Sequence, residues 1–274
     1  MRSDGARLWQ AGHGAASSFD AFGKSRKPAC RRNRNPAFLI TGFPAEQEED
    51  GMAIVTFAQV KGGSGKTTLA KCTVAEFVAR GRSVAAMDLD PNRPLGRFFA
   101  RIPELAGVEV AVPDGERRVS VLTRELAARH DTVVIDLMGA ATNDTQVAMA
   151  LSDLVIVPSQ MSEDDFRGGI ETWRQIEEAE AVARRPIARG VVMVRTSAGA
   201  VRPRVEGFLR EAYEKAGVRV LTASFGERTV WKEMSYAHWV PPLHDRDSHA
   251  AQNFAAIFDE MLGLLAALPA HAAA

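Results

Sequence analysis

A glycine-rich loop constrains this chain more than any other part of its sequence. Residues 60–68 read Val-Lys-Gly-Gly-Ser-Gly-Lys-Thr-Thr. Glycines let the backbone approach a phosphate closely, and the backbone N–H groups of such a loop surround the phosphate oxygens. In this motif the lysine, here Lys66, reaches the β- and γ-phosphates, and the next hydroxyl, on Thr67, binds Mg²⁺. The loop therefore predicts a phosphate site made by Gly62, Gly63, Ser64, Gly65, Lys66, Thr67 and Thr68.

The residues on both sides of the loop support this interpretation over a chance glycine-rich turn. Residues 53–60 are mostly apolar and β-branched, which predicts a buried strand. Residues 67–80 have helix-forming composition and stop before Gly81. A helix that begins at the loop directs its positive end toward a bound anion. The loop also carries a second lysine, Lys61, five residues before Lys66, so it is the K-G-G-x-G-K-T variant of the motif.

Composition limits the other possibilities. The chain has 274 residues, of which 46% are hydrophobic and 25% charged, so it has room for one large α/β domain or two small ones. Its formal net charge is zero, so any binding to nucleic acid needs a local basic patch. Its two cysteines, Cys30 and Cys72, lack a metal-type spacing and suit a reducing cytoplasm. Because no run of apolar residues has transmembrane length, we expect no membrane span.

The first 51 residues differ from the rest of the chain. Through Asn35 they contain eight Lys or Arg residues and two acidic ones, with little periodicity. We expect a basic, disordered extension over 1–51, although a targeting segment or a mis-assigned start codon, with Met52 as the true start, would also explain this composition. The folded domain is then expected over 52–274.

Beyond Met52, strand and helix patterns alternate. Further strands are predicted at 83–88, 108–112, 132–136, 153–158, 190–194 and 218–222, and helices at 116–130, 163–184, 201–216, 228–237 and 248–268. Near-continuous apolar strands are typical of a parallel sheet that is covered on both faces. The sequence thus predicts an α/β fold with a doubly wound, mostly parallel sheet and helices on both faces. Ligands of such sheets bind at the carboxyl ends of the strands.

The predicted last helix, 248–268, carries an apolar stripe that would suit either core packing or a membrane surface. It contains no lysine or arginine, so it lacks attraction to anionic lipids, and core packing is the better interpretation.

Acidic residues follow two of the predicted strands. Asp136 ends the strand at 132–136, where a carboxylate would hold Mg²⁺ through a water. Asp88 and Asp90 stand at the end of the strand at 83–88. A D-x-D pair can be a simple capping device, but here both carboxylates are expected at the same sheet edge as the loop. We therefore place them near the phosphates.

These elements together resemble a known family. The loop, the D-L-D-P-N segment at 88–92, the strand ending in Asp136 and the segment 150–160 are similar to the ParA/MinD family of deviant-Walker ATPases, P-loop NTPases of the SIMIBI class. The resemblance implies ATP and Mg²⁺ as cofactors, a homodimer in the ATP-bound state and slow hydrolysis. It implies that Lys61 contacts the partner's phosphates and that Asp90 positions the attacking water with support from Asp88. Catalytic roles thus fall to Lys61, Lys66, Asp88 and Asp90, and metal roles to Thr67 and, through water, Asp136.

Three branches of the family have features that this chain lacks: the basic membrane helix of MinD, the cluster cysteines of nitrogenase iron proteins and the C-terminal tyrosine cluster of the related tyrosine kinases. Three segments, 92–95, 136–139 and 227–239, look closest to the VirC-type ParA-like protein of T-DNA transfer. The chain departs from the family in three places. Met138 replaces a proline after the Asp136 strand, Arg195 and Thr196 replace an asparagine that reads adenine, and Asn92 replaces a glutamine.

The resemblance also implies partners. Relatives bind DNA without sequence preference through arginines beside the dimer interface, for which the candidates are Arg184, Arg185, Arg189, Arg202, Arg204 and Arg210, unless these form only a solvated face. We expect a cytoplasmic, nucleoid-associated switch that partitions or positions DNA or a cargo, with a second protein stimulating hydrolysis. The alternatives are a biosynthetic ATPase acting on a small carboxylic acid and a positioning ATPase for a protein assembly.

Overall fold

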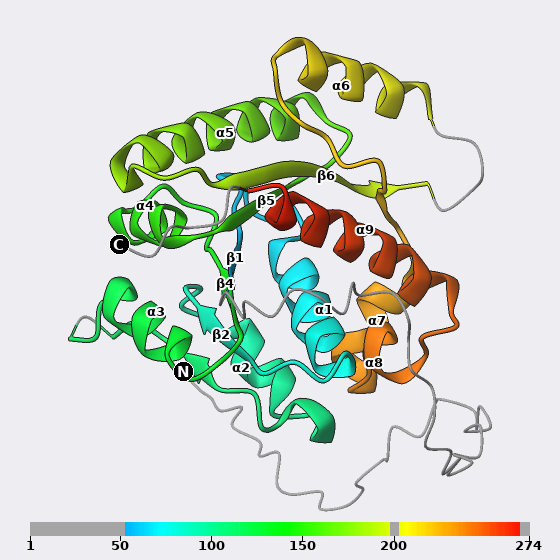
Figure 1. Ribbon diagram of the computed structural model, residues 1–274. Helices are drawn as coiled ribbons and strands as arrows, with labels where there is room; N and C mark the ends of the chain where they lie inside the picture. The colour runs from blue at the N-terminus through cyan, green and yellow to red at the C-terminus, as the bar shows by residue number, and fades with distance from the viewer. Residues whose placement is uncertain (1–52, 115, 198–202, 269–274) are drawn as a thin grey trace, which may run out of the picture. The chain divides into compact units, whose positions relative to one another are not determined.

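The predicted strands form one parallel sheet in the computed structural model, which describes residues 53–114, 116–197 and 203–268. Its seven strands lie in the order β3-β2-β4-β1-β5-β6-β7 (Figure 1). The strands are β1 Ala53–Phe57, β2 Val84–Asp88, β3 Val110–Ala111, β4 Thr132–Asp136, β5 Leu154–Ser159, β6 Ala188–Thr196 and β7 Phe225–Gly226. All pairs are parallel, so every strand presents its carboxyl end at the same edge.

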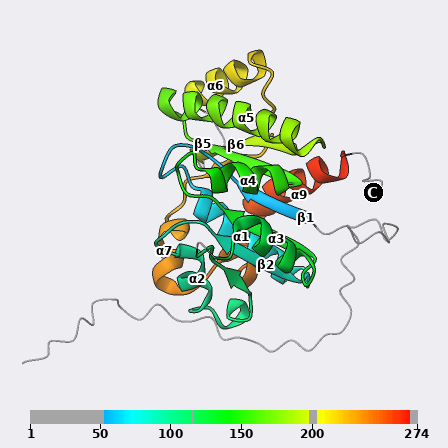
Figure 2. The same cartoon turned by 90° about the vertical axis from the view of Figure 1, so that its left-hand side faces the viewer.

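Helices cover both faces of the sheet, as the sequence predicts (Figures 1 and 2). One face packs against α1 Lys66–Ala79, α2 Pro94–Phe99, α7 Thr229–Ala237, α8 Pro241–His244 and α9 His249–Ala266. The other face packs against α3 Val119–Ala127, α4 Asn143–Leu151, α5 Glu163–Ala183 and α6 Arg204–Lys215. A single-turn 3-10 helix, η1 Pro103–Leu105, follows α2. Phe254, Ile257 and Phe258 of α9 are buried, which confirms core packing for the apolar stripe of this helix.

The prediction of a strand at 218–222 is wrong. This segment makes one isolated bridge, between Val191 and Val220, and the edge strand is β7. Around this bridge the Val191 amide donates to the Arg219 carbonyl and the Leu221 amide donates to the Val191 carbonyl, each at 2.8 Å. Beyond the bridge, side chains take the backbone groups: Arg210 donates to the Leu221 carbonyl at 2.6 Å, and Glu260 accepts from the Thr222 and Ala223 amides at 2.7 and 2.6 Å. The segment therefore runs beside β6 without pairing along its length.

The helix α4 was not predicted, although the sequence carries a local signal for it. Thr142 and Thr145 form a reciprocal capping box at the start of this helix, with Thr145 in place of the more usual Glu or Gln. The expected basic extension over 1–51 lies outside the described residues. Within the described part of the chain, no helix combines the length and apolar character that crossing a membrane requires.

Candidate nucleotide site

The sheet brings the loop and the acidic residues to one edge. In the register of the three central strands, Phe57 at the end of β1 pairs with Asp136 of β4, which pairs in turn with Asp88 of β2. The glycine-rich loop leaves β1 at this row, and α1 begins at Lys66. The predicted loop and two of its three predicted carboxylates are thus neighbours because their strands end in register.

The loop has the backbone shape that its glycines permit. Gly63 has a φ of 74° and Gly65 a φ of 101°, a region that side chains disfavour. Gly62 and Gly63 face open space, because a Cβ added at either would meet no atom within 4 Å. No side chain caps α1, whose N-terminus therefore keeps its positive end for an anion.

Lys66 is buried at the centre of this loop, with 7% of its surface exposed. Its ammonium donates to the backbone carbonyls of Gln59 at 3.0 Å and Lys61 at 3.1 Å. Burial lowers the pKa of Lys66, while the charges of Asp136 and Asp90 act to raise it. A buried cation with two neutral acceptors is well placed to gain from a bound phosphate.

Asp136 is fully buried, and neither of its carboxylate oxygens has a hydrogen-bond partner among the residues that the structure describes. Desolvation raises its pKa to about 7, and Asp88 and Asp90 push the pKa in the same direction, whereas the nearby Thr67 hydroxyl and Lys66 lower it. A buried carboxylate that makes no close hydrogen bond and has a threonine hydroxyl of the loop nearby fits a hydrated Mg²⁺. Thr67 and Asp136 could therefore hold the metal.

Asp88 and Asp90 differ in what they contact. Asp88 is fully buried and accepts from the amides of Leu95 at 2.8 Å and Asp90 at 3.1 Å, so it shapes the turn between β2 and α2. Desolvation raises the pKa of Asp88. Asp90 is half-buried, and its Oδ1 accepts from the backbone and side-chain nitrogens of Asn92 at 2.8 and 3.0 Å. Asp88 thus positions Asp90, which is the more accessible carboxylate.

Lys61 has a partner that sequence reasoning missed. Its ammonium lies 2.6 Å from Asp165 Oδ2 in the first turn of α5, and the Asp165 side chain is fully buried. Ser162 caps α5 and donates to the same oxygen at 2.5 Å. The signal in the sequence was the acidic start of the predicted helix at 163–184, which indicates a helix N-terminus but not its contact with the loop.

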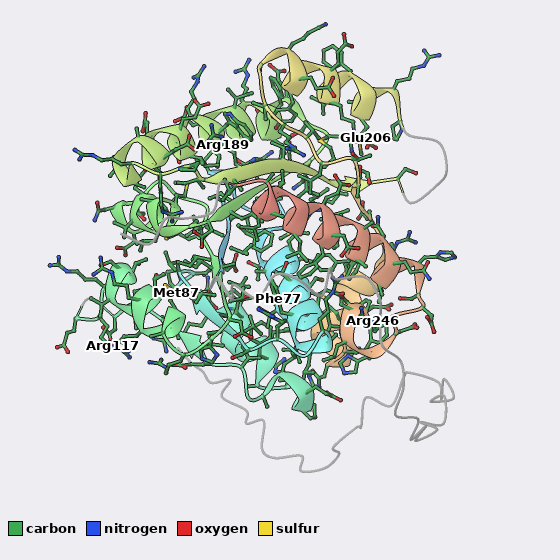
Figure 3. The ribbon with its side chains drawn as sticks, in the orientation of Figure 1. Phe77, Met87, Arg117, Arg189, Glu206 and Arg246 are labelled. Atoms are coloured by element: carbon green, nitrogen blue, oxygen red, sulfur yellow. The ribbon has the colours of Figure 1, made fainter. Side chains whose placement is uncertain are left out.

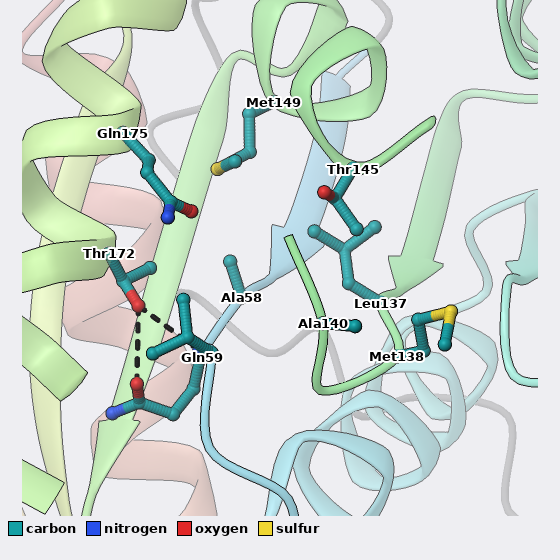
Figure 4. Close-up of a pocket in the computed structure, with 10 residues that line it drawn as sticks. Ala58, Gln59, Leu137, Met138, Ala140, Thr145, Met149, Thr172 and Gln175 are labelled. Atoms are coloured by element: carbon teal, nitrogen blue, oxygen red, sulfur yellow. Dashed lines mark hydrogen bonds between the residues drawn. The ribbon is translucent and has the colours of Figure 1, made fainter. Parts of the chain in front are cut away.

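A second missed contact fixes the start of the loop to α5. Thr172 donates to Gln59 Oε1 at 3.2 Å and accepts from the Val60 amide at 3.2 Å (Figure 4). A small cavity separates this pair from Leu137 and Met138, which follow β4. The first residues of the loop are therefore attached to α5 at two places, through Thr172 and Asp165.

The turn after β4 also packs on the loop. A Cβ added at Gly139 would lie 3.0 Å from both the N and the Cα of Gly62. A side chain here would require the Gly62 backbone to shift by a few tenths of an ångström, so the approach favours glycine. Met138 lines the cavity beside this contact.

The arginine candidates for DNA binding divide into two groups. Arg185, Arg189 and Arg210 hold the fold together: Arg185 pairs with Asp153 at 2.9 Å, Arg189 with Glu180 at 2.8 Å and Arg210 with Glu206 at 3.1 Å. Figure 3 labels Arg189 and Glu206 among the side chains of the domain. Arg184 and Arg204 are exposed, whereas Arg202 lies outside the described residues. Their role in DNA binding stays a prediction.

Known proteins are similar to this chain in sequence. The family model of the VirC1 protein matches residues 52–211. Protein ParA of Rhizobium radiobacter is 29% identical over 187 residues, which cover 67% of this chain and 82% of the relative. Protein virC1 of Rhizobium rhizogenes is 28% identical over 142 residues, which cover 46% of this chain and 57% of the relative.

Solved structures show the same fold. Apo McdA of Cyanothece has a TM-score of 0.63 at 18% identity, over 77% of this chain and all of that one. The ATP complex of a McdA variant has a TM-score of 0.62 at 18% identity, over 77% of this chain and 96% of the other. The VirC1 match spans more than half of the chain and includes the loop and all three carboxylates. This chain therefore belongs to the VirC1 protein family, within the ParA/MinD-type deviant Walker ATPases.

Proposed function

We propose that this protein is an ATP-dependent switch that dimerises around bound nucleotide, hydrolyses ATP slowly and binds DNA without sequence preference. The observation that carries the proposal is the different placement of the two loop lysines. Lys66 is buried at the centre of the loop, whereas Lys61 extends away from it to Asp165 on α5. Lys66 therefore faces the chain's own phosphates, and Lys61, on leaving Asp165, would reach those of a second copy.

ATP and Mg²⁺ fit the donor set of the site. The loop amides, Lys66 and the N-terminus of α1 would bind the triphosphate, and Thr67 and Asp136 would hold the metal ion, Asp136 through water. The bound metal would neutralise charge on the phosphate oxygens. A variant of McdA, which shares this fold, was solved with ATP, which supports the choice of nucleotide.

Asp90 would hold the attacking water. Asn92 donates twice to Asp90 Oδ1 and thereby fixes the orientation of the carboxylate. The buried Asp88 holds the backbone of the same turn. Lys61 of one copy would add positive charge at the phosphates of the other, so hydrolysis depends on the dimer.

Exposed arginines such as Arg184 and Arg204 would contact DNA phosphates in this dimer. The similarity to ParA and VirC1 supports a role in DNA partition or in conjugative transfer, with a separate protein that stimulates hydrolysis. The same similarity supports a cytoplasmic, nucleoid-associated location.

The test is the size of the protein in solution with ADP and with ATP, each with and without DNA. The parent should form a dimer with ATP and Mg²⁺ alone and join DNA only in that state. Lys66→Ala should bind ATP on the order of a hundredfold more weakly, because a buried charged contact to phosphate is lost. The double variant Lys61→Ala with Asp165→Asn should still bind ATP but stay monomeric. A parent that is monomeric with ATP, or whose turnover requires a small carboxylic acid, would contradict the proposal.

A further inference from the structure

The topology decides on which side of the loop the base of a nucleotide lies. Asp88, Asp90 and Asp136 follow β2 and β4, which lie on one side of β1, while β5, β6 and β7 lie on the other. A nucleotide whose terminal phosphate faced these carboxylates would extend its ribose and base toward β5, β6 and β7. The end of β6 is close to the loop, because a Cβ added at Gly65 would lie 3.9 Å from Val194 Cγ2.

The residue after Val194 has an unusual backbone. Arg195 has a φ of 53°, the left-handed region that few residues with side chains adopt. It also lies at an irregularity in the β6–β7 register, between the pairs Val194–Phe225 and Thr196–Gly226. Such bulges redirect a side chain, and they occur often beside functional sites. The local strain thus places an exposed arginine at the base side of the loop.

The side chain of Arg195 is connected to the loop. Its guanidinium donates to Gln160 Oε1 at 3.2 Å, and Gln160 Nε2 donates to the Gly63 carbonyl at 2.8 Å. Glu227 begins the segment after β7, where its amide donates to the Thr196 carbonyl at 2.8 Å. The Lys232 ammonium lies 2.6 Å from Glu227 Oε1 and is the main cause of the lowered pKa of Glu227. The charge of Arg195 lowers this pKa further. A guanidinium and a carboxylate therefore lie at this end of the site.

We propose that Arg195 and Glu227 read the nucleobase, and that they accept guanine at least as well as adenine. The proposal rests on the nucleotide site proposed above. A guanidinium has only donors and an ionised carboxylate only acceptors. Guanine offers the acceptors O6 and N7 to the guanidinium and the N2 amino group to the carboxylate. Adenine instead places a donor, its N6 amino group, beside N7.

The test compares the affinities for ATP and GTP in the parent and in Arg195→Asn. Asparagine both donates and accepts, which suits the N6 and N7 atoms of adenine. Dissociation constants are measured by displacement of a fluorescent nucleotide in the presence of Mg²⁺. Arg174→Asn, at an exposed position of α5, is the control for the loss of one positive charge.

We expect the parent to bind GTP at least as tightly as ATP. Arg195→Asn should shift the ratio toward ATP by about fivefold or more, the discrimination of one bidentate base contact, and the control should leave the ratio unchanged. A parent that prefers ATP, or a smaller shift in Arg195→Asn, would overturn the inference. If Lys66→Ala weakens the binding of both nucleotides but Arg195→Asn leaves the ratio of ATP to GTP affinity unchanged, only the role of Arg195 and Glu227 fails. If the parent binds neither nucleotide, the proposed function fails as well.

Discussion

Lys61 Nζ and Asp165 Oδ2 lie 2.6 Å apart and join the phosphate loop to the first turn of α5. The two partners are unequal, because the Lys61 side chain is 38% exposed and that of Asp165 is fully buried. The second carboxylate oxygen of Asp165 has no hydrogen-bond partner among the described residues. Removing the lysine therefore strands a buried charge, whereas removing the carboxylate leaves an ammonium that water can reach.

This inequality predicts that the two single substitutions destabilise the fold to different extents. Lys61→Ala should lower the free energy of unfolding by about 3 kcal/mol or more, because an unpaired carboxylate remains buried. Asp165→Asn should cost less, about 1 kcal/mol, since the amide is neutral and keeps the Ser162 contact. Urea unfolding of both single variants and of the double variant measures these free energies. If the double variant is no more stable than Lys61→Ala, the ion pair does not account for the loss.

A second prediction concerns the dimer. Asp165→Asn releases Lys61 from its own chain, so less free energy is needed to place it at a partner's phosphates. We expect ATP-dependent dimerisation at a lower protein concentration than in the parent. Analytical ultracentrifugation with ATP and with ADP provides the measurement, and Glu171→Gln, on an exposed part of the same helix, is the control. An unchanged dimerisation constant would show that the pair does not restrain the lysine.

Replacing Asp90 should separate binding from hydrolysis. Asp90→Ala removes the carboxylate assigned to the attacking water but leaves Lys66, Thr67 and Asp136 in place. ATP should still bind, the dimer should persist, and phosphate release should fall at least about a hundredfold. Turnover at the parent rate would remove Asp90 from the mechanism. Asn92→Ala should show a smaller loss, because it only orients the carboxylate.

The pKa of Asp136 predicts a pH dependence of the nucleotide-free protein. This pKa is about 7 in the folded chain and 3.8 in the reference state, so the folded state binds more protons between these values. Stability should therefore fall as the pH rises from about 4 to about 7 and then level off. The buried Asp88, whose pKa is also raised, adds to the same trend. Thermal melts of Asp136→Asn should show a shallower slope than those of the parent, and an identical slope would contradict the assignment.

The contact between Gly139 and the loop gives a steric prediction. A methyl group at Gly139 would displace the backbone of Gly62, which has no flexible side chain that could move aside. Gly139→Ala should weaken nucleotide binding by about tenfold, equivalent to one hydrogen bond, while the chain stays folded. Gly107→Ala is the matched control, because a Cβ there meets no atom within 4 Å. Equal nucleotide affinities in the two variants would show that the loop tolerates the shift.

The sequence by itself determined the strand, the loop and the helix that follows, together with Asp88 and Asp136 at the ends of their strands. These features are local: hydrophobic runs set the strands, glycines set the loop, and parallel strands bring their carboxyl ends to one edge. The sequence also showed that Arg195 stands where the resemblance implies an asparagine. The strand predicted at 218–222 stops at one bridge because Arg210 and Glu260 take the backbone groups that follow it, which no local pattern reveals.

Only the tertiary structure decided where the loop is attached. Asp165 and Thr172 lie about a hundred residues from Lys61 and Val60 along the chain and meet them because α5 packs over β5 beside β1. The bulge that turns Arg195 toward Gln160 likewise depends on the pairing of β6 with β7. Such contacts arise from packing between distant elements, so the sequence could name the phosphate site but not the residues that restrain its lysine or face its base.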